Sequence, residues 1–518
     1  MPNSQNPPLF QLIKTLSKSE KRNFRLFVNR GSGSEAVLFV QLFDVLDKQK
    51  QYDEAMIFRR IPAMKRQQLS NLKRHLYKQL LTSLRLIETP KDISLQVREQ
   101  IDFAKILYNK GLYLQSLKVL EKVKVLAQEA HQDLLELEVI EFEKRIEAQH
   151  ITRSIENRAD SLAKESTRRT QVIEGTARWS NLGLRLYELY IKMGHIRNER
   201  DYHMVRRFFE AHLPREGDFD SMTFFEKVYY CQSHVWYHHI LQNFPQCYRY
   251  AQKWVDLFHD EPDMLLRDPD LYLRGLNNLL SAFFNTGAYE RLSDTLRAFR
   301  GFEADYGRHF NKNTQTFAFL FYYTGLINRH FMEGTFSTGL AVAKEVEAKL
   351  PDFLPHLDPH HVLVFYYKIA CLYFGSGDNS TAIEFLNKII NFNAGDLRSD
   401  IQCFARILNL IAHYELRHYN LLEYLVKSVY RFLAKMEDLN LVQQEILQFL
   451  RRSLNMNPEN LQNAFIQLRD RLEPLSRHPY ESRSFLYLDI IAWLDCKIQN
   501  RPVEAVIREK FLQKNGVG

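Results

Sequence analysis

Two histidines at helical spacing are the first side chains of this chain whose types and positions could do chemistry. His234 and His238 are four residues apart, which places two imidazoles on one helix face, where they can chelate zinc. The zinc-protease motif also needs a glutamate base directly after the first histidine, and Val235 stands there instead. Because the surrounding segment is apolar and aromatic, we expect both histidines to pack in or beside the core.

A denser cluster contains His356, Asp358, His360 and His361, in a segment that also holds Pro355 and Pro359. Imidazole and carboxylate groups together can bind a divalent metal. The prolines already explain a turn, however, and no second set of ligands accompanies the cluster. We therefore expect an exposed polar turn here, and we predict neither a metal site nor a cofactor.

Patterns of covalent catalysis and of phosphate binding are missing from the sequence. There is no GxSxG nucleophile elbow, and no cysteine lies in a local catalytic signature. The segment GSGS at 31–34 lacks the lysine and the spacing of a phosphate-binding loop. We expect a protein that is not an enzyme.

Basic side chains are concentrated near the start of the chain. Residues 1–87 contain 16 Lys and Arg against six Asp and Glu, whereas the whole chain carries a formal charge of +8. Two rows at helical spacing are suited to contact phosphate backbones: Lys18, Arg22 and Arg25, and Arg74, Lys78 and Arg85. There are two other interpretations of these rows: an ordinary solvated face, or a surface that binds an acidic protein or a membrane. No sequence-reading DNA or RNA motif is present.

Composition indicates which elements position these groups. The chain has only 19 Gly and 16 Pro in 518 residues, too few for a large β protein rich in tight turns, and its hydrophobic content of 45% supplies a core.

Five widely spaced cysteines without a CxxC pair indicate a reducing compartment. No secretory leader and no apolar stretch of membrane-spanning length is evident, so we expect a cytoplasmic protein without a membrane span.

Apolar periodicity predicts an all-α fold that begins with a basic helical module at residues 1–90. Ser17 and Glu20 have the spacing of a capping box, and a helix is predicted over 67–87. A single long charged helix is predicted over about 133–175. A last helix pair is predicted over about 480–514, with a break at residues 500–502, and we interpret it as a terminal cap.

Three helix pairs align without gaps on Gly111, Gly287 and Gly377, and weaker pairs fall at 234–257, 319–346 and 403–432. The best unit, 363–395, carries its large and small residues at regular positions: Tyr366, Ile369, Ala370, Tyr373, Gly377, Ala382, Leu386 and Ile389. This pattern resembles the tetratricopeptide (TPR) family, although Ala stands where the family has Gly in the first helix and the closing Pro is missing.

The resemblance implies that residues 91–518 form a TPR-like α-α superhelix, or solenoid, with a concave groove. An irregular helical bundle uses the same periodicities and is the alternative. The groove positions that the family implies here are Lys105, Tyr108, Asn109, Arg274, Asn277, Phe284, Asn285, Tyr367 and Phe374. They do not complete the Lys/Asn/Arg clamp with which some TPR domains hold a peptide's carboxylate. They suit a mixed aromatic and polar groove for a peptide or a helix.

The sequence therefore predicts a non-catalytic scaffold or adaptor that binds a partner protein through a helical-repeat groove. The alternative is a regulator associated with nucleic acid or ribonucleoprotein, which would use the basic module at residues 1–90.

Overall fold

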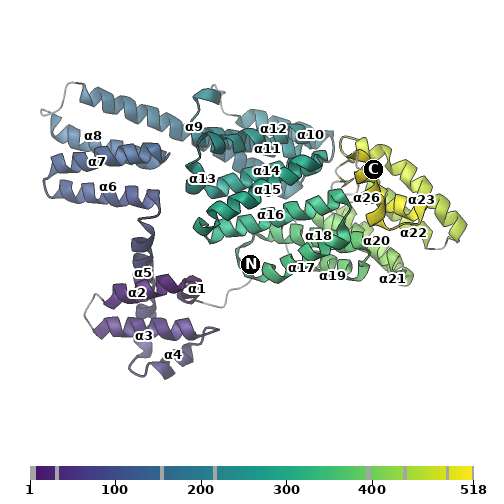
Figure 1. The fold of residues 1–518 in the computed structure, drawn as a ribbon, viewed down its shortest axis with the longest axis horizontal. Helices are drawn as coiled ribbons and strands as arrows, with labels where there is room; N and C mark the ends of the chain where they lie inside the picture. The colour runs from purple at the N-terminus through teal and green to yellow at the C-terminus, as the bar shows by residue number, and fades with distance from the viewer. Residues whose placement is uncertain are drawn as a thin grey trace. The chain divides into compact units, whose positions relative to one another are not determined.

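The computed structural model describes residues 7–29, 34–151, 157–213, 219–392, 398–435, 440–454, 456–482, 484–485 and 489–515. Throughout these ranges the secondary structure is helical and contains no strand, which confirms the all-α prediction (Figure 1). None of the helices in these ranges is long and apolar enough to cross a bilayer. The chain divides into two compact units, Met1–Ile173 (unit 1) and Glu174–Gly518 (unit 2).

The elements of unit 1 follow one another with short connections. They are α1 (Pro8–Thr15), α2 (Lys18–Asn29), α3 (Ser34–Lys48), α4 (Glu54–Arg60), α5 (Arg66–Glu88), α6 (Ile93–Asn109), α7 (Tyr113–Glu129) and α8 (Asp133–Gln149). Helix α9 (Arg158–Met193) crosses the boundary between the units.

The first five helices have a hydrophobic core of their own, with members between residues 9 and 84. The predicted capping box begins α2: the Glu20 backbone N–H donates to Ser17 Oγ at 3.2 Å, and the Ser17 N–H donates to Glu20 Oε2 at 2.6 Å. Helix α5 matches the helix predicted over 67–87, and its Leu76 and Leu80 are fully buried. The predicted break at 31–34 falls largely outside the described residues.

The prediction of one long helix over 133–175 is wrong, because α8 ends at Gln149 and a separate helix, α9, begins at Arg158. Some of the charges in this segment form ion pairs with neighbouring helices. Lys124 lies 2.8 Å from Glu143 and 2.9 Å from Glu165. These ion pairs join α7, α8 and α9, so the charged segment packs against its neighbours.

Unit 2 continues with helices that pack mostly as pairs. They are α10 (Glu199–His212), η2 (Phe219–Ser221), α11 (Phe224–Ile240), α12 (Phe244–Asp260), α13 (Met264–Arg267), α14 (Pro269–Thr286), α15 (Tyr289–Tyr306), η3 (Gly307–His309), α16 (Lys312–Glu333), α17 (Phe336–Phe353), η4 (Leu354–His356), α18 (Pro359–Ser376), α19 (Asn379–Ile390), α20 (Ser399–Glu415), α21 (Tyr419–Lys435), α22 (Leu441–Ser453), α23 (Pro458–Leu472), η5 (Pro474–Arg477), α25 (Ile490–Gln499) and α26 (Val503–Lys514).

Five of these pairs turn at one residue in the left-handed backbone region. Gly287, Gly334 and Gly377 hold this place with φ of 69°, 63° and 93°. In the pairs α11/α12 and α20/α21 a non-glycine residue holds it, namely Gln242 at 58° and Arg417 at 57°. The weaker pairs predicted over 234–257, 319–346 and 403–432 are therefore confirmed as helix pairs.

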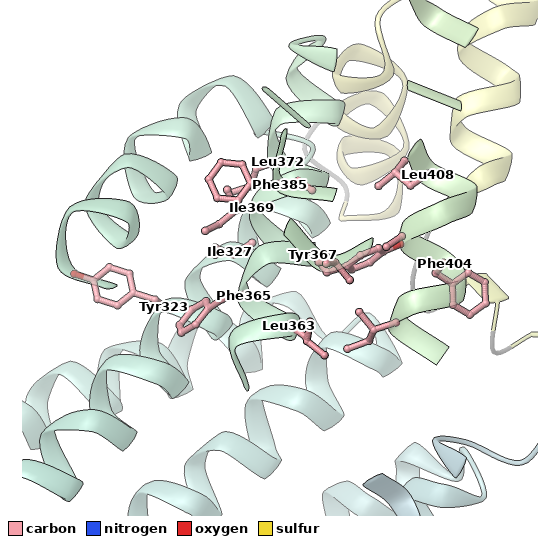
Figure 2. Close-up of a cluster of buried hydrophobic side chains, with 14 of the residues drawn as sticks. Tyr323, Ile327, Leu363, Phe365, Tyr367, Ile369, Leu372, Phe385, Phe404 and Leu408 are labelled. Carbon is pink, nitrogen blue, oxygen red and sulfur yellow. The ribbon is translucent and has the colours of Figure 1, made fainter. Parts of the chain in front are cut away.

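The first helices of successive pairs also contact one another: α14 packs against α16, α16 against α18, and α18 against α20. Figure 2 shows part of the resulting core: Tyr323 of α16 lies beside Phe365 of α18, and Phe404 and Leu408 of α20 lie on the other side of Tyr367. Such two-sided packing explains why α18 is almost wholly apolar: VLVF and IACLYF are buried on several faces.

The last pair, α25 and α26, turns at Asn500 with φ of 52° and lies within the segment predicted as a terminal cap. Helix α26 packs against α16 and α18. Its Glu504 accepts a hydrogen bond from the Ser337 backbone N–H at 3.1 Å, and Arg508 Nη1 donates to the Glu333 carbonyl at 3.3 Å. Gly334 lies directly beneath the α26 backbone, so that a Cβ there would come within 2.4 Å of the Arg508 nitrogen.

Replacing this glycine therefore tests how α26 is held. Gly334→Ala should lower the thermal midpoint more than Gly377→Ala does, because both residues have positive φ but only Gly334 touches another backbone. The matched Gly377→Ala carries only the left-handed strain, about 1–2 kcal/mol. Limited proteolysis near residues 500–502 should accelerate in Gly334→Ala alone. Equal midpoints and equal cleavage rates would contradict this packing.

Candidate functional site

Unit 2 contains a cavity of about 1050 Å³ between its helices. Side chains of α11, α14, α16 and α18 form most of its wall, together with the part of α9 that belongs to unit 2. Val503, Ile507 and Lys510 of α26 also reach the wall. The cavity exists because α14, α16 and α18 pack side by side and each leaves one face that no neighbouring helix covers.

Six of the nine predicted groove residues line this cavity: Arg274, Asn277, Phe284, Asn285, Tyr367 and Phe374. The other three, Lys105, Tyr108 and Asn109, lie on α6 in unit 1 and are outside the set that lines it. Lys105 and Asn109 are exposed, while the Tyr108 ring packs edge-on against Phe142 at 5.6 Å between centroids.

Polar side chains recur every three or four residues on the cavity face of α14, at Arg274, Asn277, Ser281 and Asn285, and Asn278 adjoins this row. The Asn285 side-chain amide donates to the Ser281 carbonyl at 2.8 Å. The amides of Asn277 and Asn278 make no hydrogen bond with a described residue. On the facing wall, the Thr324 hydroxyl is also without a partner among the described residues. These groups are available to a ligand.

Aromatic rings make up much of the remaining wall. Tyr187 and Trp236 lie 4.7 Å apart between ring centroids, and Phe284, Phe317 and Phe331 line the α14 and α16 side. Planar apolar walls with a few polar groups are typical of ligand sites in proteins.

A buried ion pair forms one end of the wall. Arg398 and Asp400 are 3% and 4% exposed in their side chains, and Arg398 Nη2 lies 2.8 Å from Asp400 Oδ2. Arg398 Nη1 also lies 3.0 Å from His360 Nδ1, and its guanidinium is 5.2 Å from the Tyr190 ring centroid. Burial, together with the Arg398 charge, lowers the pKa of His360 to about 2, so this imidazole is neutral near pH 7.

These contacts correct the prediction for the His356–His361 segment. His356 is exposed, and Asp358 caps α18 by accepting the His360 N–H at 2.9 Å. His360 and His361, however, belong to the first turn of α18 and line the cavity, so the expectation of an exposed polar turn is wrong for both. Pro359 is the first residue of α18, and the first turn of that helix faces the cavity.

Lys368 is a charged cavity residue that sequence reasoning missed. It is the one charged residue in the run from Val362 to Ser376, and a cation inside an otherwise apolar helix was the signal that could have identified it. Its Nζ donates to the Asn328 side chain and lies 5.4 Å from the Phe284 ring centroid. Desolvation lowers the pKa of Lys368 to about 8.

His234 and His238 are packed where the apolar pattern placed them. His234 is 8% exposed and stacks on Tyr250 at 4.3 Å between centroids, and His238 stacks on the same ring at 5.6 Å. No group of three or more His, Cys, Asp or Glu side chains poised to hold a metal ion occurs in the described ranges.

The two basic rows lie on α2 and α5 of unit 1, and these helices pack together. Lys18, Arg22, Arg74 and Lys78 are exposed. Arg25, by contrast, is half-buried: it pairs with Asp44 at 2.7 Å and lies over the Phe43 ring. Arg85, although exposed, lies 3.5 Å from Asp102. Four of the six predicted phosphate contacts are thus exposed without a carboxylate partner among the described residues.

No protein-family model matches this chain, and no curated protein is significantly similar to it in sequence. Its function therefore has to be inferred from the cavity and from the charged surfaces.

The buried histidines make stability depend on pH. Burial lowers the pKa of His234 to about 3 and that of His238 to about 4, against about 6.5 in an unfolded chain. As pH falls below 6.5 the unfolded chain binds these protons first, so the folded state loses up to about 1.4 kcal/mol per pH unit for each histidine. His234→Phe should reduce the fall of the thermal midpoint between pH 7 and pH 5. His309→Gln, at an exposed histidine, serves as the control. If the thermal midpoint of His234→Phe falls between pH 7 and pH 5 as much as that of the wild type, the buried histidine is not the cause.

Proposed function

We propose that this chain is a non-catalytic scaffold, and that unit 2 is a TPR-like superhelix that binds an extended peptide segment of a partner protein in its cavity. The observation that carries this proposal is the row of polar side chains on the cavity face of α14, two of whose amides have no partner among the described residues.

The spacing of that row suits a peptide backbone. Asn277, Ser281 and Asn285 are four residues apart, which is about 6 Å along a helix with 1.5 Å rise per residue. An extended peptide repeats every two residues, about 6.6 Å. A primary amide both donates and accepts, so one asparagine can pair with the N–H and the C=O of one residue of an extended peptide, which point to the same side. A helical partner would have satisfied its backbone internally and would leave the asparagines unpaired.

The superhelix is supported by the repeated use of one turn and one packing mode. Residues in the left-handed region close the pairs α14/α15, α16/α17 and α18/α19, and the first helices of these pairs pack in chain order. This is how helical-repeat proteins build a continuous concave surface.

A binding role rather than a catalytic one is supported by the state of the cavity thiols. Burial raises the pKa of Cys371 to about 12 and that of Cys247 to about 12. A thiol with such a pKa stays protonated at pH 7 and is a poor nucleophile, because the thiolate is the reactive form.

Binding can be tested with the full chain and a display library of random 12-residue peptides. Peptides selected on the wild type should bind Ser281→Trp at least about tenfold more weakly, because the indole fills space that the peptide needs. Arg297→Trp adds the same ring to an exposed face of α15 and should bind as the wild type does. Fluorescence anisotropy of the selected peptides gives both affinities. Failure to select any peptide, or equal affinity for Ser281→Trp, would overturn the proposal.

The basic module supports a second candidate function, contact with nucleic acid. Lys18 and Arg22 on α2, with Arg74 and Lys78 on α5, are exposed cations on helices that pack together. Cations of this kind bind phosphate backbones without reading sequence.

Salt dependence tests this second candidate. The full chain should bind a mixed-sequence RNA or DNA at about 50 mM salt, with affinity that falls steeply as salt rises. The quadruple change of Lys18, Arg22, Arg74 and Lys78 to Gln should reduce the slope of log affinity against log salt by up to about four, because each phosphate contact contributes roughly one. Lys21→Gln is the control, since Lys21 is already paired with Asp47 at 2.7 Å. Absence of binding at low salt would exclude this role.

A further inference from the structure

The cations of the cavity wall differ in whether a carboxylate neutralises them. Four Lys and Arg side chains line the cavity: Arg274, Lys368, Arg398 and Lys510. Arg398 pairs with Asp400, and Lys510 Nζ lies 2.7 Å from Asp495 Oδ2. Among the described residues, neither Arg274 nor Lys368 has a carboxylate oxygen within 4.0 Å. Neither cation therefore has a direct ion-pair partner among the described residues, although the Arg274 charge acts at longer range on Asp268.

Aromatic rings, rather than carboxylates, support both cations. The Arg274 guanidinium lies 4.9 Å from the centroid of Phe317 on α16. The Lys368 ammonium lies 5.4 Å from that of Phe284 and 5.6 Å from that of Phe331. Such contacts orient a cation, but they replace only part of the hydration that burial removes. A ligand carboxylate would supply what is missing.

The distance between the two cations can be estimated from the residues that they contact on α14 and α16. Arg274 and Phe284, which lies beneath Lys368, are ten residues apart on α14, or about 15 Å at 1.5 Å per residue. On α16, Phe317 contacts Arg274, and Asn328 accepts a hydrogen bond from Lys368. These two residues are eleven apart in sequence, or about 16 Å along the helix. An extended peptide covers about 16 Å in roughly five residues, and side chains on one of its faces are an even number apart. Four to six residues is the spacing that fits.

We propose that Arg274 and Lys368 bind two acidic side chains of one extended peptide, four to six residues apart, whose intervening backbone lies along the asparagines of α14. This inference rests on the proposed peptide-binding function and specifies its ligand as an acidic peptide. The two cations without a direct ion-pair partner determine the sign of the ligand charge, and the residues that they contact on α14 and α16 determine the spacing.

Affinity selection on the immobilised full chain tests the proposal. The probe is a pool of synthetic peptides, otherwise random, with Glu at two positions four or six residues apart, mixed with an equal pool carrying Gln at those positions. Mass spectrometry of the retained peptides should show Glu peptides enriched over Gln peptides about tenfold or more, as expected for charge-assisted hydrogen bonds in a desolvated site. A third pool with adjacent Glu residues should be retained less than the spaced Glu pool.

Variants assign the preference to the two cations. Arg274→Gln and Lys368→Met should each lower the Glu-to-Gln enrichment several-fold, and Arg274→Lys should retain part of it. Arg297→Gln, on the exposed face of α15, should leave the enrichment unchanged. Lys368→Met should not lower the thermal midpoint, because it removes a buried charge and keeps a similar volume. Should Lys368→Met nevertheless fail to fold, the Arg274 variants decide the question alone.

The possible failures are distinguishable. Peptides retained without a preference for Glu, or a preference that survives in Arg274→Gln and Lys368→Met, would overturn this inference and leave peptide binding intact. Retention of no peptide from any pool would overturn the proposed function together with the inference.

Discussion

The structure of unit 2 depends on the burial of α14, α16 and α18 against helices on several sides. Each contacts its own pair partner and the first helix of the next pair, so apolar residues must occupy most of its circumference. Only one face of each helix remains uncovered, and these faces together form the cavity wall. Polar side chains are concentrated on that face of α14 because any other position would place them in the core without hydrogen-bond partners.

Electrostatics separates the structural part of the cavity from the part open to a ligand. The pair Arg398–Asp400 is internally neutral, and its contact with neutral His360 completes a polar cluster that needs no further partner to be stable. Arg274 and Lys368 rest on aromatic rings instead, and the lowered pKa of Lys368 reflects the desolvation that this position imposes. These two cations are the groups to which the proposed acidic ligand would bind.

Much of this fold could be predicted from sequence, because its determinants are local. Gly287 and Gly377 marked two turns correctly, and the repeat register then placed Arg274, Asn277 and Phe284 on the cavity face. Turns at Gln242 and Arg417 were harder to place, since nothing local marks a glutamine or arginine that packing holds at positive φ. Contacts between residues distant in sequence accompany both the separation of α8 from α9 and the inward turn of His360: the ion pair of Lys124 with Glu165 at the junction of α8 and α9, and the contact of His360 with Arg398 at the first turn of α18. Periodicity alone cannot predict these.

A crystal structure of the full chain with the most strongly retained Glu-containing peptide would test the central claim most directly. The account predicts an extended peptide in the cavity of unit 2, with one carboxylate within 4 Å of Arg274, a second within 4 Å of Lys368, and backbone groups paired with Asn277 and Asn278. A peptide bound outside the cavity, or one inside it whose carboxylates avoid both cations, would contradict the account.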